Sequence, residues 1–252
     1  IGGIQYSNFP VSYSELNGIL KNYLKLTVSS EMYKELKEDN FYNLKRRKSR
    51  KYFIGPSSIS LEMNNIVSLD SENATKENIN YPYTVTEKAD GIRKLLYIAP
   101  NQRMYLIDIN LEIEFTGLIC NNKEYINTLI DGEHVMYDKN GKFINKYLSF
   151  DIYWSGDEDV RVFPLIQMEN MKYDAKISTK IFRYTEMMKS LSKMDYKPIT
   201  NKSFALDIEA KEFYSNLNNS IFQQCKTIID KANDGMFDYE TDGLIFTPID
   251  KS

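Results

Sequence analysis

The β-rich stretch between residues 81 and 154 constrains the fold of this chain most. Short runs of β-branched and aromatic residues succeed one another there, separated by turn signals such as Asp-Gly, with room for one short helix near residues 121–129. The regular strand–helix–strand alternation that builds a parallel sheet does not occur in this stretch. The pattern therefore predicts an α+β fold in which antiparallel sheets are flanked by helices.

Helical periodicity occurs on both sides of this stretch. Helices are predicted over residues 12–40, 178–194 and 206–233, a polar helix or loop over 68–80, and a last strand over 243–248. Gly55-Pro56 is the best candidate for a boundary, and the run from Phe53 to Glu62 is typical of a turn that leads into a strand. We expect an N-terminal segment over residues 1–55, helical with a basic stretch, as at the end of a preceding module. A second domain is expected over residues 56–252.

Charge is distributed unevenly along the chain. The 252 residues carry a formal net charge of −3, which is unusual for a protein that mainly grips a long nucleic acid. Residues 45–51, Lys-Arg-Arg-Lys-Ser-Arg-Lys, nevertheless hold six cations. This basic run would suit RNA or a triphosphate, and it would equally suit a solvated linker.

The two cysteines and the hydropathy of the chain indicate in which cellular compartment the protein is expected. Cys120 and Cys225 lie far apart, without the spacing of a zinc site or a disulfide framework. We therefore expect reduced thiols in an intracellular, reducing compartment. No apolar run approaches the ~18 residues that a membrane-spanning helix requires, so no membrane association is expected.

Residues 88–93, Lys-Ala-Asp-Gly-Ile-Arg, carry a chemical signal. They follow the strand-like run Tyr83–Thr86, and Asp90-Gly91 turns the chain into the next apolar run. Lys88 would then lie at a strand end, on a rigid turn between paired strands, which is a good platform for a nucleophile. A lysine with its ordinary pKa of about 10.4 is almost wholly protonated at neutral pH, so a nucleophilic lysine needs neighbours that favour the neutral amine. Arg93 is a candidate neighbour whose cation would also contact an anionic substrate, while the alternative is a plain hairpin with a solvated lysine.

Three more segments follow in the order that a nucleotidyl-transfer site requires. Ile130–Val135 places Glu133 in an alternating strand, Tyr147–Trp154 is an aromatic-rich strand, and Tyr239–Pro248 is a turn into a third apolar strand. Lys-x-Asp-Gly alone is weak evidence, because so short a pattern arises by chance in many chains. Four motifs in this order are far more specific.

Together these motifs resemble the covalent nucleotidyltransferases, the superfamily of mRNA capping enzymes and ATP-dependent polynucleotide ligases. The resemblance covers about residues 56–249. It is strongest to the guanylyltransferase domain of capping enzymes from large DNA viruses, mainly through Phe222–Lys226 and Tyr239–Pro248. It implies an ATP-grasp-like nucleotidyltransferase domain, located in the host cytoplasm or the virion. Neither the last lysine motif of the family nor its OB-fold lid is found before Ser252, so the resemblance implies a domain truncated before that motif.

The resemblance implies mRNA guanylyltransferase activity. Lys88 would attack the α-phosphorus of GTP, release pyrophosphate and hold GMP through a phosphoramidate, then pass it to the 5′-diphosphate end of RNA. Asp90 and Arg93 complete the implied catalytic group, with Arg93 on the ribose or its phosphate. RNA triphosphatase and methyltransferase modules are implied as partners in the same polypeptide or complex. The basic run at residues 45–51 would also suit the edge of such a triphosphatase module.

The resemblance implies the remaining binding residues as well. Phe150 would stack on the guanine, and Arg161 would also bind the nucleotide. Glu133 and Asp242 would hold Mg²⁺ or Mn²⁺, since such ions take oxygen ligands and usually bridge phosphates. Each residue also has a structural interpretation, because Phe150 suits a strand core and the two carboxylates suit ordinary turns. His134, whose side chain is directed away from that of Glu133 in a strand, is predicted to be structural.

Two other functions stay open. An ATP-dependent DNA or RNA ligase adenylation domain would usually show a glutamate at Asp242 and a lysine shortly afterwards, where this chain has Thr247-Pro248. An inactive nucleotidyltransferase fold could serve as a binding or scaffold module. The chain also has Leu106–Asn110 where many relatives carry an arginine, which leaves one ribose or phosphate contact unassigned.

Overall fold

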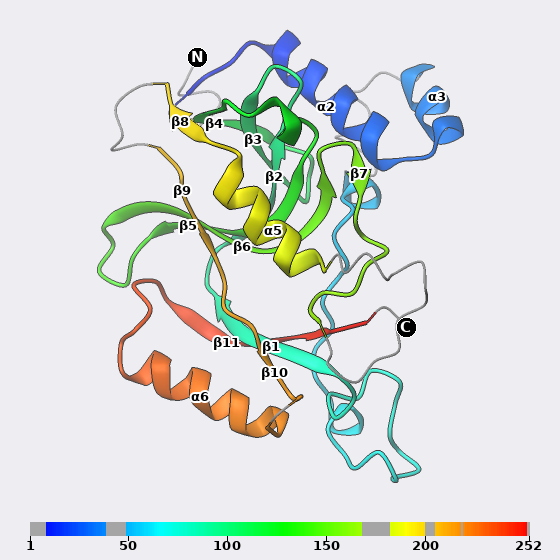
Figure 1. The fold of residues 1–252 in the computed structure, drawn as a ribbon, viewed down its shortest axis with the longest axis vertical. Helices are drawn as coiled ribbons and strands as arrows, with labels where there is room; N and C mark the ends of the chain where they lie inside the picture. Colours follow the sequence, from blue (N-terminus) through cyan, green and yellow to red (C-terminus); the bar gives the residue numbers. More distant parts are fainter. Residues whose placement is uncertain (1–8, 39–48, 168–181, 200–204, 218, 251–252) are drawn as a thin grey trace.

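The computed structural model describes residues 9–38, 49–167, 182–199, 205–217 and 219–250. These residues build two β-sheets, the larger in the upper half of Figure 1 and the smaller below it. The larger sheet contains β2 (Ile92–Ile98), β3 (Arg103–Asp108), β4 (Ile113–Cys120), β5 (Leu129–Tyr137), β6 (Phe143–Ser155), β7 (Glu158–Asp159), β8 (Tyr196–Pro198) and β9 (Asp207–Ala210). The smaller sheet contains β1 (Tyr83–Ala89), β10 (Tyr214–Ser215) and β11 (Thr241–Pro248).

Strand pairing in the described residues is almost entirely antiparallel. The larger sheet has the order β7-β6-β5-β2-β3-β4-β8, with β9 added to β6, and the smaller sheet has the order β10-β1-β11. Only the pairing of β9 with β6 is parallel. The predicted α+β architecture with antiparallel sheets is confirmed.

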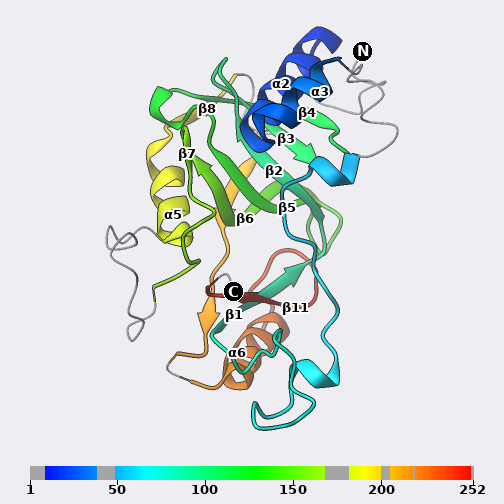
Figure 2. The ribbon, with the colours of Figure 1, turned by 90° about the vertical axis from the view of Figure 1, so that its right-hand side faces the viewer.

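Helices cover the faces of both sheets. They are α2 (Tyr13–Thr27), α3 (Ser30–Glu38), α5 (Arg183–Lys193) and α6 (Ile221–Asn233), with short 3-10 turns at η1 (Ser49–Tyr52), η2 (Met63–Asn65) and η3 (Lys123–Tyr125). Figure 2 shows α2 and α5 on opposite sides of the larger sheet and α6 against the smaller sheet. Among the described residues, none of these helices has the length and apolar character to cross a bilayer.

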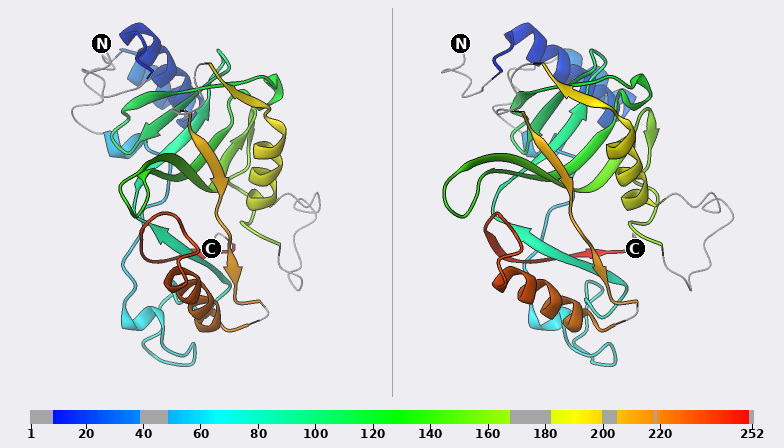
Figure 3. Two further views of the ribbon diagram at one scale, coloured as in Figure 1. Left: turned by 90° about the vertical axis from the view of Figure 1, so that its left-hand side faces the viewer. Right: turned by 60° about the vertical axis from the view of Figure 1, so that its left-hand side comes forward.

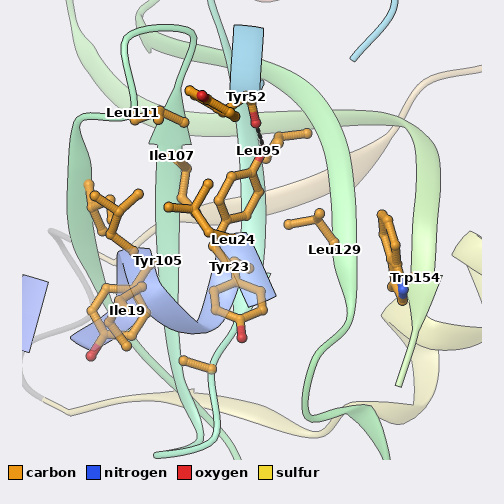
Figure 4. Packing of buried hydrophobic residues seen from close by; sticks show 14 of the residues in the cluster. Ile19, Tyr23, Leu24, Tyr52, Leu95, Tyr105, Ile107, Leu111, Leu129 and Trp154 are labelled. Atoms are coloured by element: carbon orange, nitrogen blue, oxygen red, sulfur yellow. Dashed lines mark hydrogen bonds between the residues drawn. The ribbon is translucent and has the colours of Figure 1, made fainter. Parts of the chain in front are cut away.

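Alternation along the strands explains this layering. On β2, Leu95 faces the core shared with α2, where Tyr23 and Leu24 are fully buried, as Figure 4 shows. The next residue, Leu96, faces the core on the opposite side, which includes Met187 of α5. Because both faces of β2 are buried, its apolar residues run continuously instead of alternating with polar ones.

The N-terminal helix is tied to the chain that precedes the larger sheet. The Tyr23 hydroxyl donates a hydrogen bond to the Tyr52 carbonyl oxygen at 2.8 Å, drawn as a dashed line in Figure 4. Tyr52 is itself buried in the core that α2 shares with the sheet. The boundary predicted at Gly55-Pro56 stays a prediction.

The turn after Lys88 differs from the predicted hairpin. β1 pairs with β10 and β11, whereas β2 pairs with β3 and β5, so Asp90-Gly91 carries the chain from one sheet to the other. The two strands are buried in different cores, which explains why they belong to different sheets. Val85 of β1 packs against α6, whereas the apolar residues of β2 are buried on both faces of the larger sheet. Lys88 therefore lies within β1, one residue from its end, at a crossing between sheets.

The chain crosses between the sheets a second time after β9. Residues 211–213 join β9 of the larger sheet to β10 of the smaller one, as the orange segment in Figure 3 shows. The prediction of one helix over residues 206–233 is therefore wrong for its first half. Leu206 is buried in the core of the larger sheet, and α6 begins only after Ser220, whose side chain accepts a hydrogen bond from the Gln223 N–H.

Other predicted elements need smaller corrections. The helix over residues 12–40 divides into α2 and α3, because Val28 at the end of α2 is extended. The strand expected before Glu62 is absent from the described residues 57–62. The polar segment 68–80, predicted as a helix or loop, forms turns, which agrees with the loop. The helix near residues 121–129 is only the 3-10 turn η3. Residues 178–181 of the helix predicted over 178–194 lie outside the described residues, and so do residues 45–48 of the basic run.

Candidate functional site

Lys88 lies on the surface at the crossing from β1 to β2. Its side chain is 47% exposed, and its ammonium nitrogen lies 2.6 Å from both carboxylate oxygens of Asp242 on β11. The neighbouring Asp90 N–H donates to the Glu240 carbonyl oxygen at 2.9 Å, which fixes the turn to the start of β11. Gly243, next to Asp242, has a φ of 143°, a conformation that side-chain-bearing residues rarely adopt. These contacts hold an accessible lysine and a carboxylate together from strands that are far apart in sequence.

Arg93 on β2 is held in an ion pair. Its Nε and one terminal nitrogen donate to the two carboxylate oxygens of Asp131 on β5 at 3.1 and 2.5 Å, and the other terminal nitrogen donates to the Pro56 carbonyl oxygen at 2.6 Å. Asp131 is fully buried and also accepts a hydrogen bond from the Tyr153 hydroxyl at 2.6 Å. Burial disfavours the charge on Arg93, but the hydrogen bonds and charge of Asp131 outweigh it and raise the pKa of the guanidinium. Arg93 is thus a cation whose charge is compensated by Asp131.

Asp131 was missed by the sequence analysis. It stands two residues before Glu133 in the same strand, so both side chains share one face of the sheet. An aspartate inside an otherwise apolar strand is the signal that could have found it, since a buried carboxylate requires a cationic or hydrogen-bonding partner.

Glu133 on β5 faces the same site. Burial raises the pKa of its carboxyl to about 7 against the lowering effect of Lys211, with smaller contributions from Asp131, Arg93 and Lys88. A Cβ atom on Gly91 would lie 2.8 Å from the Glu133 Cγ, so the glycine of the Lys-x-Asp-Gly motif is needed for close approach of the crossing to β5. The motif therefore packs the lysine turn directly against the acidic strand.

His134, the next residue, is turned away from this site, as predicted. Its Nδ1 lies 3.0 Å from the Lys94 ammonium nitrogen and its Nε2 lies 2.8 Å from the Asn145 side-chain oxygen. These contacts are structural.

Phe150 on β6 lies between two cations. The Arg93 guanidinium carbon and the Lys211 ammonium nitrogen each lie 5.9 Å from the centroid of its ring. The following residue, Asp151, is buried in an ion pair with Arg183, which donates to it from Nε at 2.8 Å. This pair fixes the backbone beside the half-buried ring.

Lys211, in the second crossing between the sheets, was also missed. Its side chain is 1% exposed, and its ammonium group donates to the Glu87 carbonyl oxygen at 2.8 Å and lies 3.4 Å from the Glu87 carboxylate. Burial lowers the pKa of Lys211, although the charge of Glu87 opposes that effect. No motif around this lysine distinguishes it in the sequence. Only the fold brings it beside Phe150 and Glu87.

The two remaining predicted residues, Arg161 and Asp90, lie in different parts of the structure. Arg161 lies in the turn after β7, where its side chain pairs with Asp159 at 2.6 Å and its guanidinium carbon lies 4.1 Å from the Trp154 ring centroid. The structure does not join it to the group around Lys88. Asp90 lies at the crossing itself, exposed.

A cavity of ≈ 410 Å³ is lined in part by Glu87 and Lys211. The predicted site residues do not line it. Its wall includes Lys146, whose ammonium nitrogen lies 3.0 Å from a carboxylate oxygen of Glu209 and 2.8 Å from a carboxylate oxygen of Asp238. The charge of Lys146 is therefore already paired with two carboxylates. The chemistry around Lys88 is on the open surface, not in this cavity.

Comparison with known proteins identifies the family. The model of the family "mRNA capping enzyme, catalytic domain" matches residues 23–252. The chain belongs to this family. The predicted resemblance to the capping enzymes is confirmed.

A capping enzyme relative supports the same family. The chain is 34% identical over 101 residues to a "Probable mRNA-capping enzyme" of Acanthamoeba polyphaga mimivirus. That match covers 37% of this chain and 8% of the viral protein, so the chain spans only a small part of the relative's length. A solved structure titled "Pmar-Lig_Pre." aligns with 70% of this chain and 40% of its own at a TM-score of 0.38 and 15% identity.

Residues of the capping enzyme motifs meet at one place. Four of the positions predicted from the motifs, Lys88, Asp242, Glu133 and Arg93, lie at the crossing between the sheets or on the strands beside it. Phe150 joins them through Arg93. The roles predicted for these residues stay predictions.

The two carboxylates fit a magnesium ion by their chemistry. Among the described residues, no group of three or more His, Cys, Asp or Glu side chains is arranged to hold a metal. Mg²⁺ does not need such a cage, because it is commonly bound by one or two carboxylates together with substrate phosphates and water. Glu133 and Asp242, which both lie close to Lys88, supply oxygen donors of that kind.

Proposed function

We propose that this capping enzyme domain is an mRNA guanylyltransferase. Lys88 would form a covalent lysyl-GMP intermediate with GTP, and the GMP would then pass to the 5′-diphosphate end of an RNA. The observation that carries the proposal is the accessible Lys88, paired with Asp242 beside Glu133 and Arg93 in a chain of this family.

The first half-reaction begins with loss of a proton from Lys88. The lone pair of the neutral amine forms the N–P bond to the α-phosphorus, and the bond from phosphorus to the bridging oxygen breaks. Pyrophosphate leaves with the electron pair of the broken bond, and the nitrogen gives up one more proton to the departing pyrophosphate or to water. Asp242 orients the lysine through its two short contacts in the resting protein. When GTP binds, the oxygens of its triphosphate compete with Asp242 for the Lys88 side chain.

The second half-reaction reverses the bond changes at phosphorus. A terminal oxygen of the RNA diphosphate attacks the lysyl-GMP, a P–O bond forms, the P–N bond breaks, and the Lys88 amine regains a proton. Lys88 is thereby restored. RNA is thus the proposed acceptor, and triphosphatase and methyltransferase modules are the proposed partners that prepare and complete the RNA end.

Cations and an aromatic ring are available for the nucleotide. Phe150 offers a half-buried face to the guanine, and Arg93 is fixed beside that ring for a ribose or phosphate oxygen. Mg²⁺ or Mn²⁺ held by Glu133 and Asp242 would neutralise charge that develops on the phosphates. Asp90 is proposed to act by fixing the turn that carries Lys88. Arg161 is not included, because it is paired elsewhere.

Covalent labelling tests the proposal. The protein would be incubated with Mg²⁺ and either GTP or ATP labelled at the α-phosphorus, then separated by denaturing electrophoresis. We expect label from GTP and not from ATP. Label from ATP alone would point to a ligase, and no label from either would point to an inactive binding module.

The chain offers a matched control for the nucleophile. Lys226 pairs with Asp230 on α6 at 2.6 Å, the same separation as in the Lys88–Asp242 pair, and its side chain is 75% exposed. Lys88→Ala should abolish the adduct, whereas Lys226→Ala should leave it unchanged. An adduct that survives Lys88→Ala would assign the nucleophile to another residue.

A further inference from the structure

A short segment that spans the predicted domain boundary packs on Arg93. We call residues 53–56, Phe-Ile-Gly-Pro, the strap. The Phe53 ring centroid lies 5.5 Å from the Arg93 guanidinium carbon, and the Pro56 carbonyl oxygen accepts a hydrogen bond from Arg93 at 2.6 Å. The strap therefore contacts the guanidinium with both a ring and a backbone acceptor.

Gly55 brings the strap backbone unusually close to Arg93. A Cβ atom built on Gly55 would lie 2.3 Å from a terminal nitrogen of Arg93 and 2.9 Å from its guanidinium carbon. Real Cβ atoms do not come this close to other heavy atoms, so any side chain at this position must displace the guanidinium or the strap. The absence of a side chain at residue 55 is a condition for the observed position of Arg93.

The strap itself is anchored. Tyr52, which precedes it, is buried in the core that α2 shares with the larger sheet, and its carbonyl oxygen accepts the Tyr23 hydroxyl at 2.8 Å. Phe53 and Ile54 pack against the same core. The strap thus has a fixed position from which it can hold Arg93 together with a second rigid acceptor, the fully buried Asp131.

We propose that the strap is a positioning element of the nucleotide site: it sets the guanidinium of Arg93 for a ribose or phosphate oxygen of GTP. An arginine side chain has five N–H donors, and three of them donate to Asp131 and Pro56 among the described residues. Asp131 and the strap together therefore fix the orientation in which the guanidinium can meet a ligand. This inference rests on the proposed function, because it assigns the ligand of Arg93 to the nucleotide.

Gly55→Ala tests the strap, with Gly18→Ala on α2 as its control. A Cβ on Gly18 would meet no atom within 4 Å. Gly55→Ala should weaken GTP binding about tenfold and slow adduct formation further, since misplacement of a positioning group by about 1 Å is costly in the transition state. Gly18→Ala should change neither quantity. Unchanged GTP affinity in a folded Gly55→Ala protein would overturn the proposal.

A double-mutant cycle separates positioning from packing. In an Arg93→Lys background, Gly55→Ala should cause no further loss of GTP affinity, because the group that the strap positions has already been replaced. Losses that simply add would show that Gly55 acts on packing alone, and would overturn the proposal. Phe53→Leu is the second variant should Gly55→Ala fail to fold. It adds no atom against Arg93, and we expect a severalfold loss of affinity with the same non-additivity.

The Arg93 side chain also gives a readout that needs no nucleotide. The Nε–H signal of Arg93 in an NMR spectrum, assigned by its loss in Arg93→Lys, should shift or broaden in Gly55→Ala and stay in place in Gly18→Ala. If the wild-type protein binds no GTP, the proposed function fails while this signal still reports on the strap. If GTP binds and the signal is insensitive to Gly55→Ala, the strap proposal fails alone.

Discussion

At the residue scale, the site is a set of charges that compensate one another. Lys88 faces Asp242, Arg93 faces Asp131, and Lys211 faces Glu87. Of these pairs only Lys88–Asp242 is about half exposed on both sides, at 47% and 51%. Exposed ion pairs contribute little to stability, so this pair can open for a substrate at small cost. The buried pairs instead hold their partners in place, because breaking one leaves an uncompensated charge inside the protein.

The chemistry of a lysyl adduct gives a prediction for Lys88→Arg. Arginine keeps the positive charge beside Asp242, but its guanidinium stays protonated at any useful pH and cannot attack phosphorus. We expect GTP binding to be nearly retained and the covalent adduct to be lost. Labelling after denaturation, alongside an equilibrium binding measurement, separates the two. An arginine variant that still forms a stable adduct would rule out Lys88 as the nucleophile.

The carboxylates give a second prediction at this scale. Glu133→Ala and Asp242→Ala should each slow adduct formation by at least about a hundredfold, as expected when charge in the transition state loses a preorganised partner. GTP binding should weaken far less. Asp230→Ala, which removes the carboxylate of the control pair on α6, should have no effect. Normal single-turnover labelling in both site variants would mean that neither carboxylate acts in adduct formation.

At the scale of elements, the site exists because the chain crosses twice between two sheets. The crossing at Asp90-Gly91 carries Lys88, and the crossing after β9 carries Lys211. Glu87 of β1 binds Lys211, and its carboxylate also accepts the Tyr239 hydroxyl at 3.1 Å near the start of β11. The two crossings and the entry to β11 are thereby fixed relative to one another.

Gly91→Ala tests how tightly the first crossing is packed. Its Cβ would lie 2.8 Å from both the Glu133 Cγ and the His134 carbonyl oxygen, and 3.0 Å from a Val135 methyl group. Overpacking of this kind typically costs about 1–3 kcal/mol. We expect a loss of that order in urea unfolding, together with slower adduct formation because Glu133 is displaced. Gly18→Ala, in a helix with open space, should be neutral or slightly stabilising. Equal stabilities for the two variants would contradict the close approach.

These elements show what the sequence could and could not predict. Lys88, Glu133, Phe150 and Asp242 could be singled out from the sequence because each lies in a motif with local signatures, and their roles stay predictions. Asp131 and Lys211 could not be assigned, since their importance depends on contacts with Arg93 and Glu87 across long stretches of chain. The prediction of a helix over 206–233 is wrong for its first residues for a related reason. The strand β9 is defined by its pairing with β6, not by its own residues.

At the scale of the whole molecule, the N-terminal helix and the larger sheet share one core. Tyr23 and Leu24 of α2 are fully buried together with Leu95 of β2 and Leu129 of β5. The same core holds Tyr52, from which the strap extends to Arg93. A continuous path of packed side chains therefore runs from α2 to Arg93. This path crosses the predicted boundary at Gly55-Pro56.

Leu24→Ala tests whether residues 1–55 unfold independently of the sheet. Removing a fully buried leucine side chain typically costs about 2–5 kcal/mol, because transfer free energy is lost and a cavity remains. Since Leu24 packs in the core of the larger sheet, we expect this loss to lower hydrogen-exchange protection of β2 and β5 as well as of α2. Leu61→Ala is the matched control, because that leucine is 47% exposed, and it should change protection little. If Leu24→Ala lowers protection in α2 alone and leaves β2 and β5 as in the wild type, residues 1–55 form an independent module. In that case the strap would be held only locally, and Leu24→Ala would also leave GTP binding unchanged.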